Sequence, residues 1–92
     1  MALEFSWNPS KAAANLEKHG VRFEDASTAF ADPLSITVPD PAHSDDEQRY
    51  VMVGRSIEGK LLVVVHSERK DSIRIISARE ASRRERREYE QG

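Results

Sequence analysis

The stretch that decides the fold reads LLVVVH at residues 61–66, IRIISAR at residues 73–79 and ASRRERREYE at residues 81–90. The β-branched residues of the first two segments predict strands at residues 60–67 and 72–77, joined by a turn at residues 68–71, with Arg74 inside the second strand. An arginine in a strand must reach solvent or an anion, because leaving it buried and unpaired is costly. We therefore expect one face of the sheet to carry cationic groups at a defined spacing, which suits a phosphate backbone.

The segments upstream extend this pair of strands into a larger sheet. Residues 48–56 predict another strand, and Glu58-Gly59 predicts a tight turn into the strand at residues 60–67. These three strands, joined by tight turns, predict an antiparallel meander, and residues 34–38 predict a further strand. Residues 3–7 predict a short first strand, with Leu3, Phe5 and Trp7 on one face.

Three helices are expected around the sheet. Asn8 can cap a helix that starts at Pro9 and runs to about Lys18, where Gly20 ends it in a left-handed conformation. We expect this helix to bury Ala12, Ala13 and Leu16.

A second short helix is expected at residues 23–31, with Phe23, Ala26, Ala29 and Phe30 at helical spacing. Asp32-Pro33 stops it.

The last helix is expected to begin after Ser82 and to end near Tyr89. Ser82 and Glu85 match the capping-box pattern, in which each residue hydrogen-bonds the backbone of the other. The chain order is therefore strand, helix, helix, four strands, helix. This order predicts an α+β fold, a small antiparallel sheet with helices packed on one face and the other face partly open. We expect one domain spanning residues 1–92, with a polar, acidic, mobile loop at residues 39–47.

The composition excludes several classes of protein. The 92-residue chain has no cysteine, so disulfides and thiolate metal sites are excluded. Its longest apolar run, residues 61–65, is too short to cross a bilayer, and no signal peptide precedes it. We expect a cytoplasmic protein without membrane contact. The three histidines form no metal-ligand spacing, and His43 is expected on the surface of the acidic loop.

The charges are distributed unevenly along the chain. Residues 1–46 carry three basic and eight acidic residues, whereas residues 47–92 carry eleven basic and eight acidic ones. Ten of the fourteen basic residues are arginine, which binds phosphate in a planar, bidentate manner. The pI of about 5.9 is not basic, so any contact with nucleic acid must be local.

Several blocks of the chain resemble the family of BrnT toxins. They are Lys11 with the run Asn15 to Ala26, then Phe30 to Pro33, Glu47 to Arg49 with Gly54, Leu62 to Arg69, Ile73 to Arg79, and Glu85 with Tyr89. The blocks follow in order over essentially the whole chain. Arg22 departs from the pattern, because a serine or another helix-capping residue is more usual there.

The resemblance implies a ribonuclease toxin of a type II toxin–antitoxin system, with a RelE/ParE-like fold. Such toxins cut RNA without a metal or other cofactor and thereby stop translation. The partner implied is a BrnA-like antitoxin with a ribbon-helix-helix domain, in a complex of two toxins and two antitoxins. That complex represses its own operon, and it contacts the operator DNA only through the antitoxin.

Metal-free RNA cleavage needs a base, an acid and cations that stabilise the phosphorane-like transition state. Arg74 is the first catalytic candidate, because its strand fixes its position; the alternative is an ion pair with Glu68 or Glu85. Arg79 lies past the predicted end of the strand, so it either turns to the same face or sits at the start of the last helix. Arg69, in the predicted turn, is a weaker candidate.

His66 and Tyr89 complete the catalytic candidates. Histidine titrates near neutral pH and can serve as acid or base, although His66 could equally be a half-buried residue at a strand end. Tyr89 could orient phosphate or stack on a base, or pack its ring on the sheet.

Other basic residues are candidates for binding the RNA backbone. Arg49 and Arg55 share a strand face by parity and could extend a phosphate track. Lys11 and Lys18 share one face of the first helix and could serve the RNA or the antitoxin. Arg83 starts a group of four helix arginines that point in several directions, so not all of them can touch one ligand.

Two other functions fit the same residues. A toxin of this fold could block a target protein without catalysis, or serve only as a scaffold for the antitoxin. A small nucleic-acid-binding domain without catalysis is the third possibility, and it would show salt-dependent binding.

Overall fold

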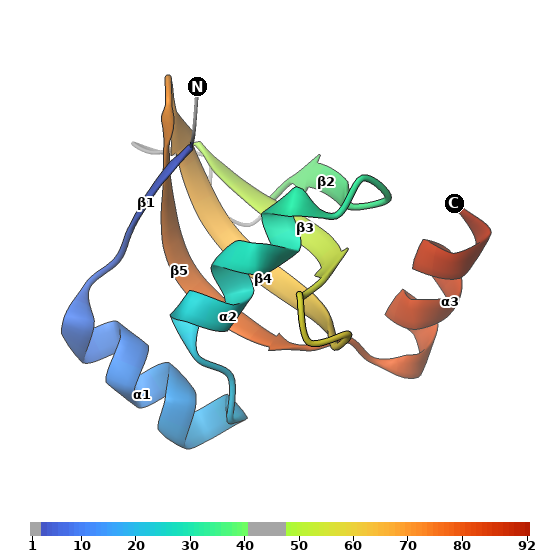
Figure 1. Cartoon of the computed structure of the whole chain (residues 1–92), viewed down its shortest axis with the longest axis horizontal. Helices are drawn as coiled ribbons and strands as arrows, with labels where there is room; N and C mark the ends of the chain where they lie inside the picture. The colour runs from blue at the N-terminus through green and yellow to red at the C-terminus, as the bar shows by residue number, and fades with distance from the viewer. Residues whose placement is uncertain (1–2, 41–47) are drawn as a thin grey trace.

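The computed structural model describes residues 3–40 and 48–92 and confirms the α+β class with the expected order of elements (Figure 1). The elements are β1 (Glu4–Ser6), α1 (Pro9–His19), α2 (Phe23–Thr28), a 3-10 helix (Ala29–Ala31), β2 (Ile36–Pro39), β3 (Arg49–Arg55), β4 (Leu61–Arg69), β5 (Ser72–Glu80) and α3 (Arg83–Gln91). Most of the expected acidic loop, with His43, lies outside the described residues.

The strands form one five-stranded sheet in the order β1-β5-β4-β3-β2. Strands β3 to β5 pair antiparallel with their chain neighbours, which confirms the meander, and β2 pairs antiparallel with β3 and extends it. The sheet is not wholly antiparallel, however, because β1 pairs parallel with β5 through Glu4 and Ser72, Phe5 and Ile73, and Ser6 and Arg74. The first and last strands meet because the two helices between β1 and β2 carry the chain across the sheet (Figure 1).

Several element boundaries differ from those expected. Strand β4 continues to Arg69, so this arginine ends a strand instead of lying in the turn. Strand β5 continues to Glu80, so Arg79 lies inside the strand, and a bulge between Arg74 and Arg79 shifts the alternation so that both lie on one face. A bulge between Val65 and His66 lengthens the β4–β5 ladder by one residue on the β5 side.

The expected helix at residues 23–31 is divided in two. It is α-helical over Phe23–Thr28 and tightens to a 3-10 turn over Ala29–Ala31. The helix tightens just before Asp32 because Pro33 disfavours the α conformation at the residue preceding it, and Asp32 is extended.

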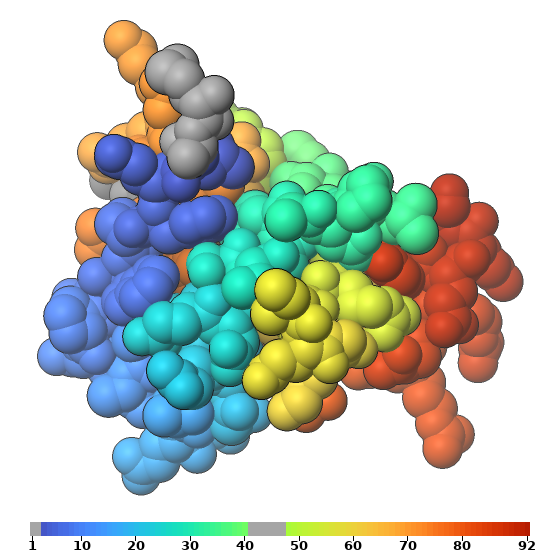
Figure 2. Space-filling view, viewed as in Figure 1, coloured from blue at the N-terminus to red at the C-terminus, as the bar shows by residue number. Residues whose placement is uncertain are grey.

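Helices α1 and α2 cover one face of the sheet. Met52, Val64 and Ala78 are paired across β3, β4 and β5 and share this face. Viewed from this side, α1, α2 and the segment leading to β2 hide most of the sheet (Figures 1 and 2). The core between the layers consists of Val21, Phe23, Ala26, Ala29, Met52, Leu62, Val64, Ile73, Ile75 and Ala78, with Phe5, Trp7, Ala12 and Phe30 packed against it. Leu3 is 49 % exposed, whereas Phe5 and Trp7 are partly buried against the core, so only these two residues of the expected Leu3–Phe5–Trp7 face pack inward.

Helix α3 departs from the expectation that the helices share one face. Paired residues across strands lie on the same face, and Val53, Val63 and Arg79 form such a row on the face opposite α1 and α2. Helix α3 pairs with this row, because Glu85 binds Arg79. It therefore lies at the end of the second face, apart from α1 and α2 (Figure 1). None of the helices in the described part of the chain is long and apolar enough to cross a membrane.

The helix termini follow the sequence signals. The Asn8 side chain accepts hydrogen bonds from the backbone amides of Ser10 and Lys11, and Gly20 ends α1 with φ of 71°. Ser82 and Glu85 form the expected capping box. Arg22 occupies the N-cap position of α2 and makes no side-chain cap, so the departure at Arg22 leaves the start of this helix uncapped, as expected.

Asn15 ties α1 to the sheet, a role that the sequence analysis did not assign. Helix α1 buries Asn15, while Ala13 and Leu16, which were expected inside, are exposed. The Asn15 amide donates to the carbonyls of Val21 (3.0 Å) and Ala78 (2.8 Å), and its Oδ1 accepts from the Ala78 amide at 3.1 Å. Because β1 pairs with β5 only at residues 72–74, Asn15 supplies at Ala78 the partners that a neighbouring strand would supply.

We predict that Asn15→Ala lowers the free energy of unfolding by about 2 to 4 kcal/mol, because it leaves the buried amide and carbonyl of Ala78 unpaired. Urea unfolding measures the loss. The control is Glu17→Ala, an exposed position on the same helix, which should change stability by less than about 0.5 kcal/mol. Equal effects of the two substitutions would contradict the role of Asn15.

Candidate functional site

A row of polar and cationic residues crosses the sheet on the face opposite α1 and α2. Arg49 on β3 pairs with Ser67 on β4, and Ser67 pairs with Arg74 on β5. Directly paired residues on one face have Cβ atoms about 4.5 to 5.5 Å apart. Arg74 is exposed and Arg49 half-buried, and neither side chain makes a hydrogen bond or ion pair within residues 3–40 and 48–92. We call these three residues the Arg49–Ser67–Arg74 row.

The central residue of this row is a buried serine. Ser67 is 1 % exposed, and its hydroxyl finds no hydrogen-bond partner in the described part of the chain. An unpaired buried hydroxyl costs about 1 to 3 kcal/mol of stability. The sequence analysis did not single out Ser67. Its alternation with Val63 and Val65 could have placed it on the strand face opposite His66.

Arg79 lies farther along the same face and is already paired. Its two terminal nitrogens donate to the two carboxylate oxygens of Glu85, each at 2.8 Å. This bidentate contact lowers the pKa of Glu85 to about 2 and raises that of Arg79, while burial opposes both shifts. With Glu85 bound to Arg79 and Glu68 bound to His66, the two alternative partners of Arg74 are engaged elsewhere. Arg79 is four residues from the row along the paired strands, a distance of about 13 Å.

Arg55 and Tyr89 belong to a second cluster, which holds α3 against the sheet. The Tyr89 hydroxyl donates to Asp32 Oδ2 at 2.6 Å, and the Arg55 guanidinium lies 5.6 Å from the centre of the Tyr89 ring. The Arg55 amide also donates to Asp32, and the Arg55 side chain donates to the carbonyl of Gly59. Arg49 and Arg55 do share a face, as predicted, but they lie about 20 Å apart along β3.

The charges in this cluster support each other. Burial alone would raise the pKa of Asp32, but the hydrogen bonds from Tyr89 and from the backbone of Arg55 and Leu34 outweigh it and lower the pKa. The hydrogen bond to Asp32, with burial, raises the pKa of Tyr89. The Tyr89 ring is packed and its hydroxyl is hydrogen-bonded within the protein, which matches the structural alternative considered for this residue.

His66 lies on the other face of the sheet, away from the arginines. It is 0 % exposed, on the side of Leu62 and Val64 as its parity predicted, and it is more buried than a strand-end histidine was expected to be. Its Nε2 lies 2.9 Å from Glu68 Oε2, and its ring contacts Phe30 edge-on and stacks on Tyr50. The structure therefore does not bring His66 together with Arg74.

The remaining basic candidates are dispersed. Lys11 and Lys18 line a shallow groove where α1 meets Ile76 of β5, at the outer edge of that strand. Arg83 is the exposed first residue of α3. Arg69 ends β4 on the same face as Ser67, two residues along the strand.

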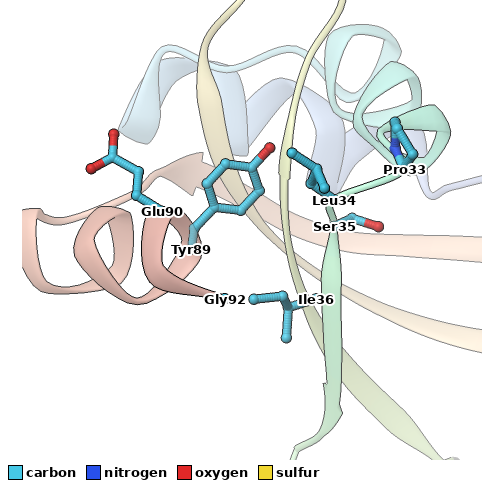
Figure 3. Close-up of a pocket in the computed structure, with 7 residues that line it drawn as sticks. All are labelled: Pro33, Leu34, Ser35, Ile36, Tyr89, Glu90 and Gly92. Carbon is cyan, nitrogen blue, oxygen red and sulfur yellow. The ribbon is translucent and has the colours of Figure 1, made fainter.

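A cavity of about 550 Å³ lies between β2 and α3. Figure 3 shows its lining, with Tyr89 facing Leu34 and Gly92 beside Ile36. No arginine contributes to its wall, and the cavity is separate from the Arg49–Ser67–Arg74 row.

The geometry is suited to binding an anion, because Arg49 and Arg74 lie on one sheet face with no partner in the described part of the chain, and the paired Arg79 lies farther along the same face. Guanidinium groups match phosphate oxygens in bidentate contacts, and fixed strands limit their movement. Among residues 3–40 and 48–92, no group of three His, Cys, Asp or Glu side chains is placed to hold a metal ion.

Comparison with known proteins gives a family and a similar fold. The family model for BrnT, described as the ribonuclease toxin of a type II toxin–antitoxin system, matches residues 7–85. The structure is similar to the 1.1 Å crystal structure of the Brucella abortus ribonuclease toxin BrnT, with a TM-score of 0.64 and 21 % sequence identity. That match covers 89 % of this chain and 100 % of the other. A search of curated proteins found no significant match.

We predict that Glu85→Gln lowers the free energy of unfolding at pH 7 by about 1 kcal/mol, because Arg79 is 44 % exposed and solvent screens the pair. The Glu85 pKa falls from 4.5 to about 2 on folding, so this contribution is complete above pH 4.5 and disappears as the pH drops to about 2. Urea unfolding of both proteins over this pH range measures it.

The matched control is Glu88→Gln, on the same helix. Glu88 lies 3.7 Å from Arg84, and both side chains are mostly exposed, so its loss should cost less than about 0.5 kcal/mol at every pH. If the two glutamine variants unfold alike at pH 7, the Arg79–Glu85 pair does not hold α3.

Proposed function

This chain belongs to the BrnT family of ribonuclease toxins of type II toxin–antitoxin systems, and we propose that it cleaves RNA on the sheet face opposite α1 and α2. The observation that carries the proposal is Arg74. It lies inside a strand, is exposed on that face, and makes no ion pair or hydrogen bond with any other described residue. A cation fixed by the backbone and left without a partner is suited to a phosphate group.

Arg74 has the role of stabilising charge in the transition state. Attack of a ribose 2′-hydroxyl on the adjacent phosphate creates a crowded, negatively charged phosphorane-like species, which guanidinium donors held in place stabilise. Arg79 faces the same side, but its bidentate pair with Glu85 neutralises its charge, so in this proposal Arg79 holds α3 beside the site and Arg74 supplies the cation. Glu85 itself, with a pKa of about 2, is too weak a base to remove a hydroxyl proton near neutral pH.

The other candidates have supporting roles in this proposal. Arg49 extends the cationic face at β3, and Arg69 and Arg83 add charge at its margins. Arg55 and Tyr89 hold α3 in place through Asp32, and His66 supports the core on the opposite face. Lys11 and Lys18 lie in a separate groove and would contact RNA only where it leaves the face.

The family implies an antitoxin protein as partner. We propose, from the resemblance, that this antitoxin is BrnA-like with a ribbon-helix-helix domain and forms a complex of two toxins and two antitoxins. The complex would repress its own operon and contact operator DNA only through the antitoxin. A net charge of −2 for the toxin supports that assignment, because it provides no general attraction for DNA. The proposal places this single-domain toxin in the cytoplasm.

We predict that Arg74→Ala lowers the rate of RNA cleavage by about 10²- to 10³-fold without lowering stability, because it removes a transition-state contact and no structural one. The measurement combines induction in bacteria, total RNA integrity, and cleavage by purified protein. Arg22→Ala is the control, since Arg22 is an exposed arginine on the side of α1 and α2. It should cleave RNA at the wild-type rate.

Other outcomes separate the competing functions. Growth arrest with intact RNA would favour a toxin that blocks a protein target. Salt-dependent RNA binding without arrest or cleavage would favour a binding domain. Either result, from folded protein, would overturn the proposed ribonuclease activity.

We also predict that cleavage continues after removal of divalent ions, because the arginines supply the charge that a metal would otherwise supply. Cleavage by purified protein in EDTA should match that in magnesium after correction for ionic strength. A loss of activity in EDTA that zinc or magnesium restores would contradict the metal-free mechanism.

A further inference from the structure

We propose that Ser67 is the centre of a phosphate-binding site, in which its hydroxyl and the guanidinium groups of Arg49 and Arg74 hold one phosphodiester of the RNA. This inference rests on the proposed function and adds to it a residue and a point of contact. Nothing in the composition or the motifs of the chain assigns a role to Ser67.

The first observation is the unsatisfied hydroxyl. Ser67 is 1 % exposed, and its Oγ has no partner within residues 3–40 and 48–92. Serines that are buried for structural reasons normally find a carbonyl or an amide, as Ser56 does when its Oγ accepts from the Lys60 amide. A hydroxyl left unpaired in a folded protein suggests a bonding partner that arrives with a ligand.

The second observation is what flanks that hydroxyl. Ser67 is paired with Arg49 on one side and with Arg74 on the other, so cationic side chains start about 5 Å away in both directions. The next row, Val51–Val65–Ser77, carries no charge. Ser67 therefore places a hydroxyl donor between two guanidinium groups on this face of the sheet.

The chemistry of the three groups defines the ligand. Two guanidinium groups and a hydroxyl can all donate to a group that accepts from several directions, which fits the non-bridging oxygens of a phosphodiester. Arg49 and Arg74 are long and free of other described partners, so both can swing outward to admit the phosphate and then bind it. The site would hold the RNA backbone irrespective of base identity.

The experiment measures binding of a 2′-O-methyl RNA oligonucleotide, which lacks the attacking hydroxyl and is not cleaved. We expect Ser67→Ala to raise its Kd about tenfold, the effect of one lost hydrogen bond to a charged group. The Tm of this variant should equal or exceed that of the wild type, because alanine removes an unpaired hydroxyl. Ser67→Thr, which keeps the hydroxyl, should restore binding.

Ser77→Ala is the matched control, a serine on the same face whose cross-strand partner is Val65. It should leave the Kd unchanged. In the wild type, titration with inorganic phosphate should shift the backbone amide resonances of Ser67 and its two neighbours across the strands, a measurement that needs no folded variant.

The outcomes distinguish this inference from the proposed function. Normal oligonucleotide binding by Ser67→Ala, or no phosphate-dependent shift at Ser67, would overturn the phosphate site even if Arg74→Ala abolishes cleavage. If wild-type protein neither binds the oligonucleotide nor cleaves RNA, both proposals are wrong. Weaker binding by Ser67→Ala with an unchanged Kd for Ser77→Ala would support the site.

Discussion

The arrangement of the molecule depends on the hydrogen bonds between Asn15 and Ala78. Beyond residue 74, β5 has no strand on its outer side, so the backbone of Ala78 would otherwise be left unpaired in a buried position. The Asn15 amide supplies a donor and an acceptor there, as a neighbouring strand would. This contact fixes α1 at the edge of the sheet, and α2 follows onto the same face. The opposite face is consequently left to the arginines and α3.

The division into two faces explains why arginines of similar sequence context have different roles. Arg79 and Arg55 lie where α3 meets the sheet. Arg79 binds Glu85 of that helix. Arg55 lies against the Tyr89 ring and donates its amide to Asp32, which also binds Tyr89. Arg49 and Arg74 make no hydrogen bond or ion pair with any other described residue, so their guanidinium groups stay available. Glu85 has two structural functions at once, because the same carboxylate caps the start of α3 and binds Arg79.

Much of the fold was predictable because its signals are local. The caps at Asn8 and Ser82 and the left-handed glycine at residue 20 appeared where the sequence indicated, and each expected strand exists, although β4 and β5 end later than expected. The errors concern features that depend on distant residues. The parallel pairing of β1 with β5, the burial of Asn15 in place of Leu16, and the extension of β5 to Glu80 each depend on a partner far away in the sequence. For the candidate site, parity alone placed Arg49 and Arg55 on one face. The strand register was needed to show that His66 lies on the other face from Arg74 and that Ser67 lies beside Arg74.

The sequence by itself determined the class of fold, the order of its elements and, through the spacing of its motifs, the resemblance to BrnT toxins that the family match confirms. These follow from periodicity, capping residues and turn residues, which act over a few positions of the chain. Only the tertiary structure decided that Arg79 is paired, whereas Arg74 has no partner among the described residues. An ion pair such as Arg79–Glu85 and an unpaired hydroxyl such as that of Ser67 result from strand register and helix docking, since these bring together groups that no local pattern relates.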